Sequence, residues 1–495
     1  MALLDGLSAI VNTHFSIVAI LLGLCLLYTV ASTKKVLTGP LSSLPGPFLS
    51  RWTDLHVRLI LVFGKRAQYV HWLHKKYGPV VRVGPDTVDV SDGEAALSIH
   101  RAKGGFAKSS FYDTGGRVQS MFSTRDRKFH ANRRRLLGPC FTEASLNTMQ
   151  PIIDDLARLA IENMRQEAGS SAGSVDVLKW WTLFAMDTIG QLSIGESFGM
   201  VESGVKNEFA EDISNAGSVL PLRTAFPTLI WIGNYLPLPF FRNIALSRQR
   251  IVAHMSQRTA AYLKLMKEDT DKGKGTIFSS LVRGNSAELT PLDLTIESLS
   301  YITAGTDTTA VTLAYLIWAV CRDPGIKERL VRELQPLPES PTYKDVKNLP
   351  YLNCVIQEAL RRYGAAPGAL PRDVPKEGLT VGSHHIPGGV VVSTQGYSLH
   401  RDSKIFPDPE KFNPSRWEHP TQEATDSLMA FGTGPRGCIG VHLAKMELRL
   451  VTALFFKNFP GAKVSKQGGM SDADMDEMTS FLLMPRGHRC LIELI

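Results

Sequence analysis

The spacing of hydrophobic and polar positions predicts long helices separated by a few short strands. Residues 441–456 carry apolar side chains at helical spacing, and residues 291–322 do so over a longer stretch. The second segment also has a start signal, because Thr290 and Asp293 can form a capping box around Pro291. We therefore expect the longest helix of the chain over this segment, ending before an Asp-Pro pair.

Other segments predict hairpins and shorter helices. Residues 77–92 alternate apolar and polar side chains around a Gly-Pro turn, which predicts a β-hairpin. A basic helix is expected over residues 125–141, ending near a second Gly-Pro pair, and another helix over residues 351–362. Residues 379–393 predict a further hairpin, with its turn among His384, His385, Gly388 and Gly389.

The first fifty residues predict a membrane anchor followed by a stiff hinge. Residues 15–33 hold no charge, and as a helix of about 1.5 Å per residue they would span roughly 28 Å, close to the hydrocarbon thickness of a bilayer. A cleaved signal peptide is the alternative, but no basic region precedes the segment and two lysines follow it. The lysines predict that residues 1–14 face the lumen and that the body stays in the cytosol. Residues 34–50 are rich in proline and predict a hinge before residues 51–495.

The charge balance and the cysteine count indicate which partners and which redox compartment to expect. Among the 495 residues, 55 are Lys or Arg and 47 are Asp or Glu, which gives a net charge of +8. This excess is mild and scattered, so we do not expect nucleic-acid binding; a basic face for an anionic membrane or an acidic protein is the simpler use. The six cysteines form no close pair, which predicts a reducing compartment without disulfides or a zinc site.

The stretch FGTGPRGCIG, residues 431–440, is suited to holding one cysteine sulfur against a metal. Its glycines let the backbone approach closely, and a backbone amide near a thiolate can donate a hydrogen bond to it. Because a helix is expected just after the stretch, its dipole favours negative charge on the Cys438 sulfur, and Arg436 adds positive charge nearby. A small buried hydrophobic cysteine is the alternative. Five fixed positions, F-x-x-G-x-R-x-C-x-G, favour the metal ligand.

This stretch resembles the haem-thiolate loop of the cytochrome P-450 superfamily. The resemblance implies that Cys438 is the axial ligand of a haem iron and that Arg436 pairs with a haem propionate. It further implies that Phe431 packs near the sulfur and that Gly432 belongs to the cofactor-binding loop. The implied fold is the cytochrome P-450 fold, a single large domain, mainly α with small β-sheets, here with one N-terminal transmembrane helix.

A second motif lies in the middle of the longest expected helix. AGTDTT, residues 304–309, interrupts an apolar segment with residues of poor helix propensity. Close packing on the glycine, with the threonines bonded to the preceding turn, is one explanation. The hexapeptide is also similar to the oxygen-activation motif of the superfamily. That similarity implies that Ala304 leaves space over the iron, that Thr308 holds a water or an oxygen-derived group, and that Asp307 relays protons.

Three further residues match propionate-binding positions of the superfamily. His130 and Arg134 stand where most relatives have Trp-x-x-x-Arg, so an imidazole that can still donate to a carboxylate replaces the indole. Arg372, at the end of the small-residue stretch 364–372, matches a second such arginine. The other basic residues of the 125–141 helix form either a solvated face or a docking surface for a reductase, namely Lys128, Arg133 and Arg135.

Glu358 and Arg361 are three residues apart on one expected helix and can face each other. Such a pair is weak support by itself, because exposed ion pairs of this spacing are common. About fifty residues later comes FPDPEKFNPSRW, residues 406–417. The resemblance implies that Arg416 joins the pair in a triad that locks the core on the haem side.

Two other segments bear on the substrate. Residues 219–241 are apolar but are interrupted by four prolines, too many for a second membrane span. Core packing is one interpretation; the resemblance implies the other, a lid over the active site that touches the bilayer. Residues 364–372 and 481–484 face substrate in relatives, so we expect a roomy pocket for a bulky, largely apolar substrate.

The motifs predict a haem-dependent monooxygenase that inserts one oxygen atom from O₂ into such a substrate. The implied cofactor is haem b, with electrons from NADPH through NADPH-cytochrome P-450 reductase and cytochrome b5 as a further candidate donor. The hinge and motifs resemble microsomal enzymes of filamentous fungi, many of them in secondary metabolism, located in the endoplasmic reticulum membrane. Two alternatives stay open: a reductase-independent haem-thiolate isomerase or dehydratase, and a non-catalytic haem-binding protein.

Overall fold

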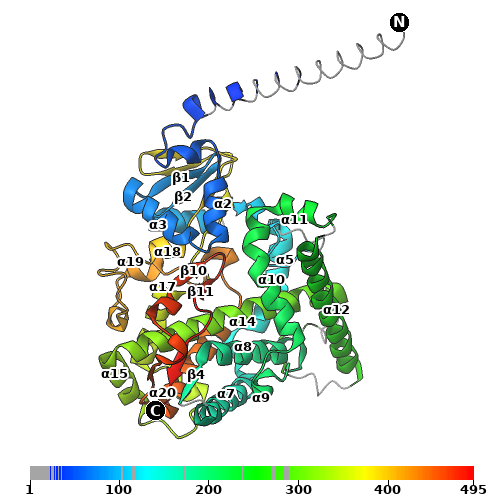
Figure 1. Cartoon of the computed structure of the whole chain (residues 1–495), viewed down its shortest axis with the longest axis vertical. Helices are drawn as coiled ribbons and strands as arrows, with labels where there is room; N and C mark the ends of the chain where they lie inside the picture. Colours follow the sequence, from blue (N-terminus) through cyan, green and yellow to red (C-terminus); the bar gives the residue numbers. More distant parts are fainter. Residues whose placement is uncertain are drawn as a thin grey trace.

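The computed structural model describes residues 36–101, 104–113, 119–170, 173–236, 238–268, 275–279 and 289–494, with residues 20, 23, 27, 29–31, 33, 34 and 281 besides. The expected anchor, residues 15–33, lies largely outside them. Within the described ranges, no helix is both long enough and apolar enough to cross a membrane. The architecture is a mainly helical single domain with small sheets, as the resemblance implied (Figure 1).

The helices of the described residues are α2 (Leu55–Val62), α3 (Arg66–Tyr77), α4 (Gly93–His100), α5 (Arg127–Leu137), α6 (Glu143–Asn147), α7 (Gln150–Ser170), α8 (Val177–Ile194), α9 (Met200–Ser203), α10 (Glu208–Ala225), α11 (Pro227–Gly233), α12 (Pro239–Glu268), α14 (Pro291–Arg322), α15 (Pro324–Leu334), α16 (Tyr343–Val346), α17 (Pro350–Tyr363), α18 (Gly396–Leu399), α19 (Gln422–Ser427) and α20 (Val441–Asn458). The strands are β1 (Val80–Gly84), β2 (Thr87–Val90), β3 (Ala107–Lys108), β4 (Ser174–Asp176), β5 (Arg372–Asp373), β6 (Leu379–Val381), β7 (His384–Ile386), β8 (Val391–Ser393), β9 (Lys463–Val464), β10 (Glu477–Thr479), β11 (Leu483–Pro485) and β12 (Leu491–Glu493).

The largest sheet joins segments from distant parts of the chain, in the order β1-β2-β8-β5-β3. The first predicted hairpin is confirmed, because β1 and β2 pair antiparallel with Val80 opposite Val90. The second prediction was wrong about its turn. Gly382, at φ +55°, takes the left-handed conformation that glycine tolerates best, and the chain reverses there between β6 and β7. The two histidines therefore lie within β7, and β8 leaves to pair with β2.

Helix α14 begins and ends where the sequence predicted. The Asp293 amide donates to the Thr290 hydroxyl at 3.1 Å, and the Asp293 carboxylate accepts from the Thr290 amide at 2.9 Å. The helix runs through the middle of the molecule and packs along α8, with α20 and α17 against its other sides (Figure 1). Because most of its second half is buried, its position fixes the interior on which the candidate site is built.

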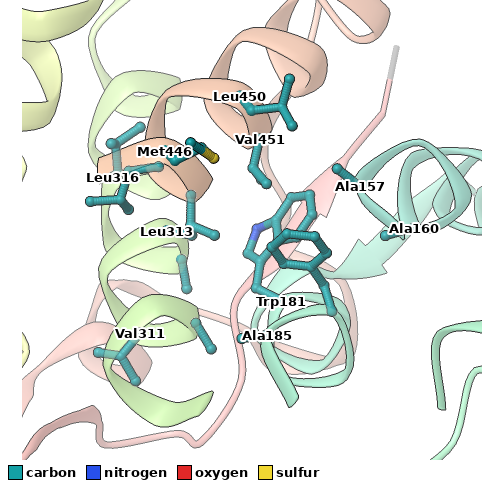
Figure 2. Close-up of a cluster of buried hydrophobic side chains, with 14 of the residues drawn as sticks. Ala157, Ala160, Trp181, Ala185, Val311, Leu313, Leu316, Met446, Leu450 and Val451 are labelled. Carbon is teal, nitrogen blue, oxygen red and sulfur yellow. The ribbon is translucent and has the colours of Figure 1, made fainter. Parts of the chain in front are cut away.

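The main core lies where α7, α8, α14 and α20 meet. Trp181 of α8 is fully buried among apolar side chains of the other three helices, including Ala157, Leu313 and Val451 (Figure 2). Truncating a buried tryptophan to alanine costs about 3–5 kcal/mol in proteins generally. Burial of this size holds α14 and α20 in fixed relation, and these helices carry or adjoin the two main sequence motifs.

A buried polar contact also joins α14 to α20. The Thr309 hydroxyl donates to a carboxyl oxygen of Glu447 at 3.0 Å, and both side chains are buried. Burial raises the pKa of Glu447 to about 8, and the bond from Thr309 offsets this only in part. The carboxyl is therefore mostly protonated at neutral pH, which avoids placing an unpaired charge between the two helices.

Glu447→Gln should make the protein more resistant to alkaline unfolding. The Glu447 pKa rises from 4.5 to about 8 on folding, so the stabilisation from its bound proton is present below pH 4.5 and is lost as the pH rises to 8. The loss is on the order of 5 kcal/mol. As the pH increases, the thermal unfolding midpoint of the holoprotein should fall less in the variant than in the wild type. The exposed Glu423→Gln is the control, and parallel pH curves for all three proteins would contradict the assignment.

Candidate functional site

The loop before α20 holds Cys438 in a tightly bonded turn. The Cys438 amide donates to the Phe431 carbonyl at 2.8 Å, and the Gly432 amide donates to the Met429 carbonyl at 2.9 Å. Gly434 has φ +69°, and a Cβ atom there would lie 2.0 Å from the His100 carbonyl oxygen. Only glycine fits this position, which explains why the sequence motif requires it.

The Cys438 side chain is exposed although protein atoms surround its sulfur. Protein atoms crowd it so closely that burial raises the pKa of its thiol, yet the side chain is accessible to water. The Gly440 amide and the Arg134 guanidinium act in the opposite direction but do not prevail. A backbone amide and a nearby positive charge thus lower the cost of a negative sulfur, as the sequence predicted, but burial outweighs them in the protein without a bound group. A sulfur that is inert as a thiol but accessible suits a metal, because coordination deprotonates the sulfur.

Part of the surface of α14 is accessible near the middle of the helix, although most of its second half is buried. Thr303 and Ala304 are exposed and Asp307 and Thr308 are half-buried, whereas Tyr301, Ile302 and the turn that begins at Thr309 are buried. The Thr308 hydroxyl donates to the Ala304 carbonyl at 2.7 Å, and a Cβ atom on Gly305 would lie 3.2 Å from Ile189. Close packing at Gly305 and threonine bonds to the preceding turn are therefore present for Thr306 and Thr308, whereas Thr309 donates to Glu447 instead. Neither contact accounts for the exposure of Ala304.

Asp307 sits where burial controls its ionisation. Desolvation raises the pKa of its carboxyl, and the Lys206 ammonium only partly opposes this shift. The neighbouring Thr308 hydroxyl has committed its proton to a carbonyl and keeps its lone pairs as acceptors. The pair therefore combines a carboxyl that holds its proton more tightly than usual with a hydroxyl that can accept a hydrogen bond.

Positive side chains gather around the cysteine loop. Arg134 donates to the Gly437 carbonyl at 2.8 Å, Arg436 to the Thr124 carbonyl at 2.8 Å, and Arg372 to the Tyr112 hydroxyl at 3.4 Å. Within the described ranges, no carboxylate forms an ion pair with any of these three guanidiniums. The structure thus brings together the three arginines that the resemblance implied, with their charges not neutralised.

Two further basic groups complete this set. Burial, together with nearby Arg372 and Arg436, lowers the pKa of Lys108 to about 6. Burial and the same kind of repulsion lower the pKa of His130 to about 4, so its imidazole is neutral at pH 7. Lys108 was not predicted. It reaches the site only because β3 pairs with β5, which places Lys108 directly opposite Arg372.

The three unpaired guanidiniums, beside Lys108 and His130 with their lowered pKa values, fit a ligand that carries carboxylates. Several basic groups repel one another in a poorly solvated place, which is unfavourable unless anions are bound there. An iron porphyrin with two propionates supplies such anions, and the accessible Cys438 sulfur supplies a ligand for its iron. The residues present therefore fit a haem.

The Glu358, Arg361 and Arg416 triad is present as expected. Arg361 binds both carboxylate oxygens of Glu358 at 2.8 Å with neither side chain exposed, and Arg416 approaches Glu358 at 3.3 Å. The Trp417 indole also donates to Glu358 at 3.0 Å, a contact that the sequence reasoning did not predict. The remaining Arg361 hydrogens bind backbone carbonyls of His400, Pro409 and Lys411.

Two expectations about surfaces needed correction. Arg133 is buried and forms an ion pair with Asp293, so it is structural and not part of a docking face. Lys128 and Arg135 of the same helix are exposed. Core packing of residues 219–241 is also wrong for most of that segment, because the prolines divide it among three helices and many of its large apolar side chains are exposed, including Leu229, Trp231, Tyr235, Leu238 and Phe240.

Comparison with known proteins bears on the family. The family model described as Cytochrome P450 matches residues 45–492. Cytochrome P450 monooxygenase tazI of Aspergillus terreus is 46% identical over 95% of this chain and 97% of its own length. Cytochrome P450 monooxygenase orf2 of Aspergillus niger is 38% identical, with 93% and 94% covered. Cytochrome P450 monooxygenase stcB of Emericella nidulans is 35% identical, with 92% and 89% covered.

The chain belongs to the cytochrome P450 family, the haem-containing class that its fold and its cysteine loop had indicated. It is a cytochrome P450 monooxygenase, as its relatives over nearly the whole length are.

Arg361→Ala should prevent haem retention. The substitution leaves the buried Glu358 carboxylate without its main partner, which costs about 3–5 kcal/mol in comparable buried pairs. Purified protein should contain little haem and unfold at a lower temperature. Arg329→Ala is the matched control, because it breaks an exposed ion pair with Glu418 and should lose less than about 1 kcal/mol. Full haem content in the Arg361 variant would overturn the structural role of the triad.

Proposed function

We propose that this protein inserts one oxygen atom from O₂ into a bulky, largely apolar substrate, in fungal secondary metabolism, with electrons from an NADPH-dependent reductase. The observation that carries the proposal is the accessible Cys438 sulfur amid five basic side chains with no acidic partner in the described part of the chain. Names of relatives as monooxygenases support oxygenation over the isomerase or dehydratase alternative, and over a purely haem-binding role.

The cofactor would be haem b, held by residues already in place. Cys438 would ligate the iron, and Phe431 and Gly432 would form the loop beneath it, with Ala304 leaving space on the opposite side. The propionates would take the basic side chains, namely His130, Arg134, Arg372, Arg436 and Lys108. Bound haem supplies the activation of O₂.

Asp307 and Thr308 would deliver protons to the distal side. The raised pKa of Asp307 lets its carboxyl hold a proton closer to neutral pH, where a general acid is most effective. Thr308 keeps acceptor capacity next to Ala304 and can orient a water between the carboxyl and the reacting atoms. Each side chain would thus have a separate task, one supplying the proton and the other setting its direction.

The body would rest on the endoplasmic reticulum membrane, anchored by residues 15–33. Large apolar side chains are exposed on α11 and the start of α12, and others on the hinge and α2, which packs against α10. Trp231 is 60% exposed and Tyr235 is 74% exposed, and such rings favour the membrane interface. Lys128 and Arg135 would offer charge to an acidic reductase or to cytochrome b5.

Removing residues 1–33 should weaken membrane binding without ending it. The exposed apolar side chains would still partition into the interface, so the truncated protein should pellet with microsomes in part and be released at alkaline pH. Adding Trp231→Glu to the truncation should release it at neutral pH. Complete release of the full-length chain at alkaline pH would contradict the anchor.

Cys438→Ser in the producing strain tests the reaction. The variant should lack the thiolate spectrum of reduced, carbon monoxide-bound protein, and the strain should accumulate a precursor that is lighter than the product by one oxygen or richer by two hydrogens. Precursor and product of equal mass would favour the isomerase instead.

Thr308→Val separates the proton-delivery roles from cofactor binding. The variant should keep haem and bind substrate, but it should consume NADPH with release of hydrogen peroxide in place of product. Thr308→Ser keeps the hydroxyl and serves as the matched control. Unchanged product yield per NADPH in the valine variant would remove Thr308 from proton delivery.

A further inference from the structure

Three phenylalanines from separate segments meet beside the basic cluster. Phe111 follows β3, Phe122 precedes α5, and Phe481 lies between β10 and β11. The ring centroids of Phe122 and Phe481 are 6.1 Å apart with planes at 81°, and those of Phe111 and Phe481 are 6.4 Å apart with planes at 29°. We call these three rings the aromatic corner.

The aromatic corner keeps much of its surface open. Phe122 is 49% exposed, and Phe111 and Phe481 are only half-buried, in contrast to the phenylalanines of the main core. The centroid distances of 6.1 and 6.4 Å are those of ordinary aromatic contacts, so the rings already pack against one another. The ring faces that they leave exposed are available to a ligand.

Contacts on several sides fix the position of Phe122. The Lys108 side-chain nitrogen donates to the Phe122 carbonyl and lies over the ring, 4.2 Å from its centroid. The preceding amide, of Met121, donates to the buried Glu297 carboxylate of α14 at 2.8 Å. Two residues later, the Thr124 carbonyl accepts from Arg436. The ring is therefore held by the same residues that surround the cysteine loop.

The aromatic corner borders the haem-binding side chains. Tyr112 lies between Phe111 at 5.3 Å and Phe122 at 5.9 Å, and its hydroxyl accepts from Arg372. Phe481 is anchored beside the small-residue stretch, because the Leu483 amide donates to the Ala365 carbonyl at 2.8 Å. A molecule that rests on the three rings would therefore lie next to the cofactor.

We propose that the aromatic corner binds a planar aromatic ring of the substrate, a statement that rests on the proposed monooxygenase function. Phe122 and Phe481 are nearly perpendicular, so a flat ring stacked on one presents its edge to the other. Both arrangements are favourable for aromatic pairs. A saturated ring system of the same size has no π-face and a thicker profile, so it gains only apolar contact. The substrate class is therefore planar aromatic, beyond being bulky and apolar.

The test compares two probes of one skeleton, 9-phenanthrol and its perhydro form, by calorimetric titration of the ferric holoprotein without reductase. Wild type should bind the aromatic probe roughly tenfold more tightly than the saturated one. Phe122→Leu and Phe481→Leu should each reduce this preference about fivefold, with haem content unchanged. Phe48→Leu, at an exposed ring of the hinge, is the control and should keep the preference.

Equal binding of both probes by wild type, or an undiminished preference in both leucine variants, would overturn the aromatic corner. Loss of affinity for both probes alike would also overturn it, because that result indicates only a change of pocket size. The titration needs no turnover, so it stands apart from the proposed function. If the Cys438→Ser strain accumulates no oxygen-poor precursor while the preference holds, the monooxygenase proposal fails and the aromatic site remains.

Discussion

A buried ion pair, Glu358 with Arg361, fixes the loop that presents Cys438. Arg361 binds the His400 carbonyl, and the His400 ring returns a bond to the Arg361 carbonyl while accepting from the Met429 amide. Burial and adjacent arginines lower the pKa of His400 to about 3, so the imidazole stays neutral and can serve as donor and acceptor at once. The Met429 carbonyl in turn holds the Gly432 amide. A chain of hydrogen bonds thus connects the ion pair to the cysteine loop.

The site itself shows the opposite arrangement, with charge left unpaired. Around the loop, Arg134, Arg372 and Arg436 bind neutral oxygens, and Lys108 lies against two aromatic rings. Such an arrangement stores unfavourable repulsion in the protein alone and releases it when anions bind. Stability comes from the fully paired lock and from the main core, whereas the unpaired cluster would supply the proposed affinity for a carboxylate-bearing cofactor. The two kinds of charge occupy adjacent parts of the same fold.

Within about one turn, helix α14 has residues that pack against neighbouring helices and residues that remain accessible at the candidate site. Gly305 permits close approach to Ile189 of α8, and Thr309 bonds to Glu447 of α20, so both sides of the helix are constrained. Between them, Ala304 and Thr308 remain accessible. A helix held this firmly on two sides can keep a hydroxyl and a carboxyl in a constant position, which the proposed proton delivery would require.

Local signals in the sequence determined a large part of this protein. Capping residues and spacing set the bounds of α14, and the motifs named Cys438 and the Glu358–Arg361 pair, because each depends on neighbours within a few residues. Tertiary structure alone decided which charges meet. Strand pairing places Lys108 opposite Arg372, and Arg133 forms an ion pair with Asp293, which is 160 positions away in the sequence. Such pairings form only when segments that are distant in the sequence pack together, and a local sequence pattern does not contain that information.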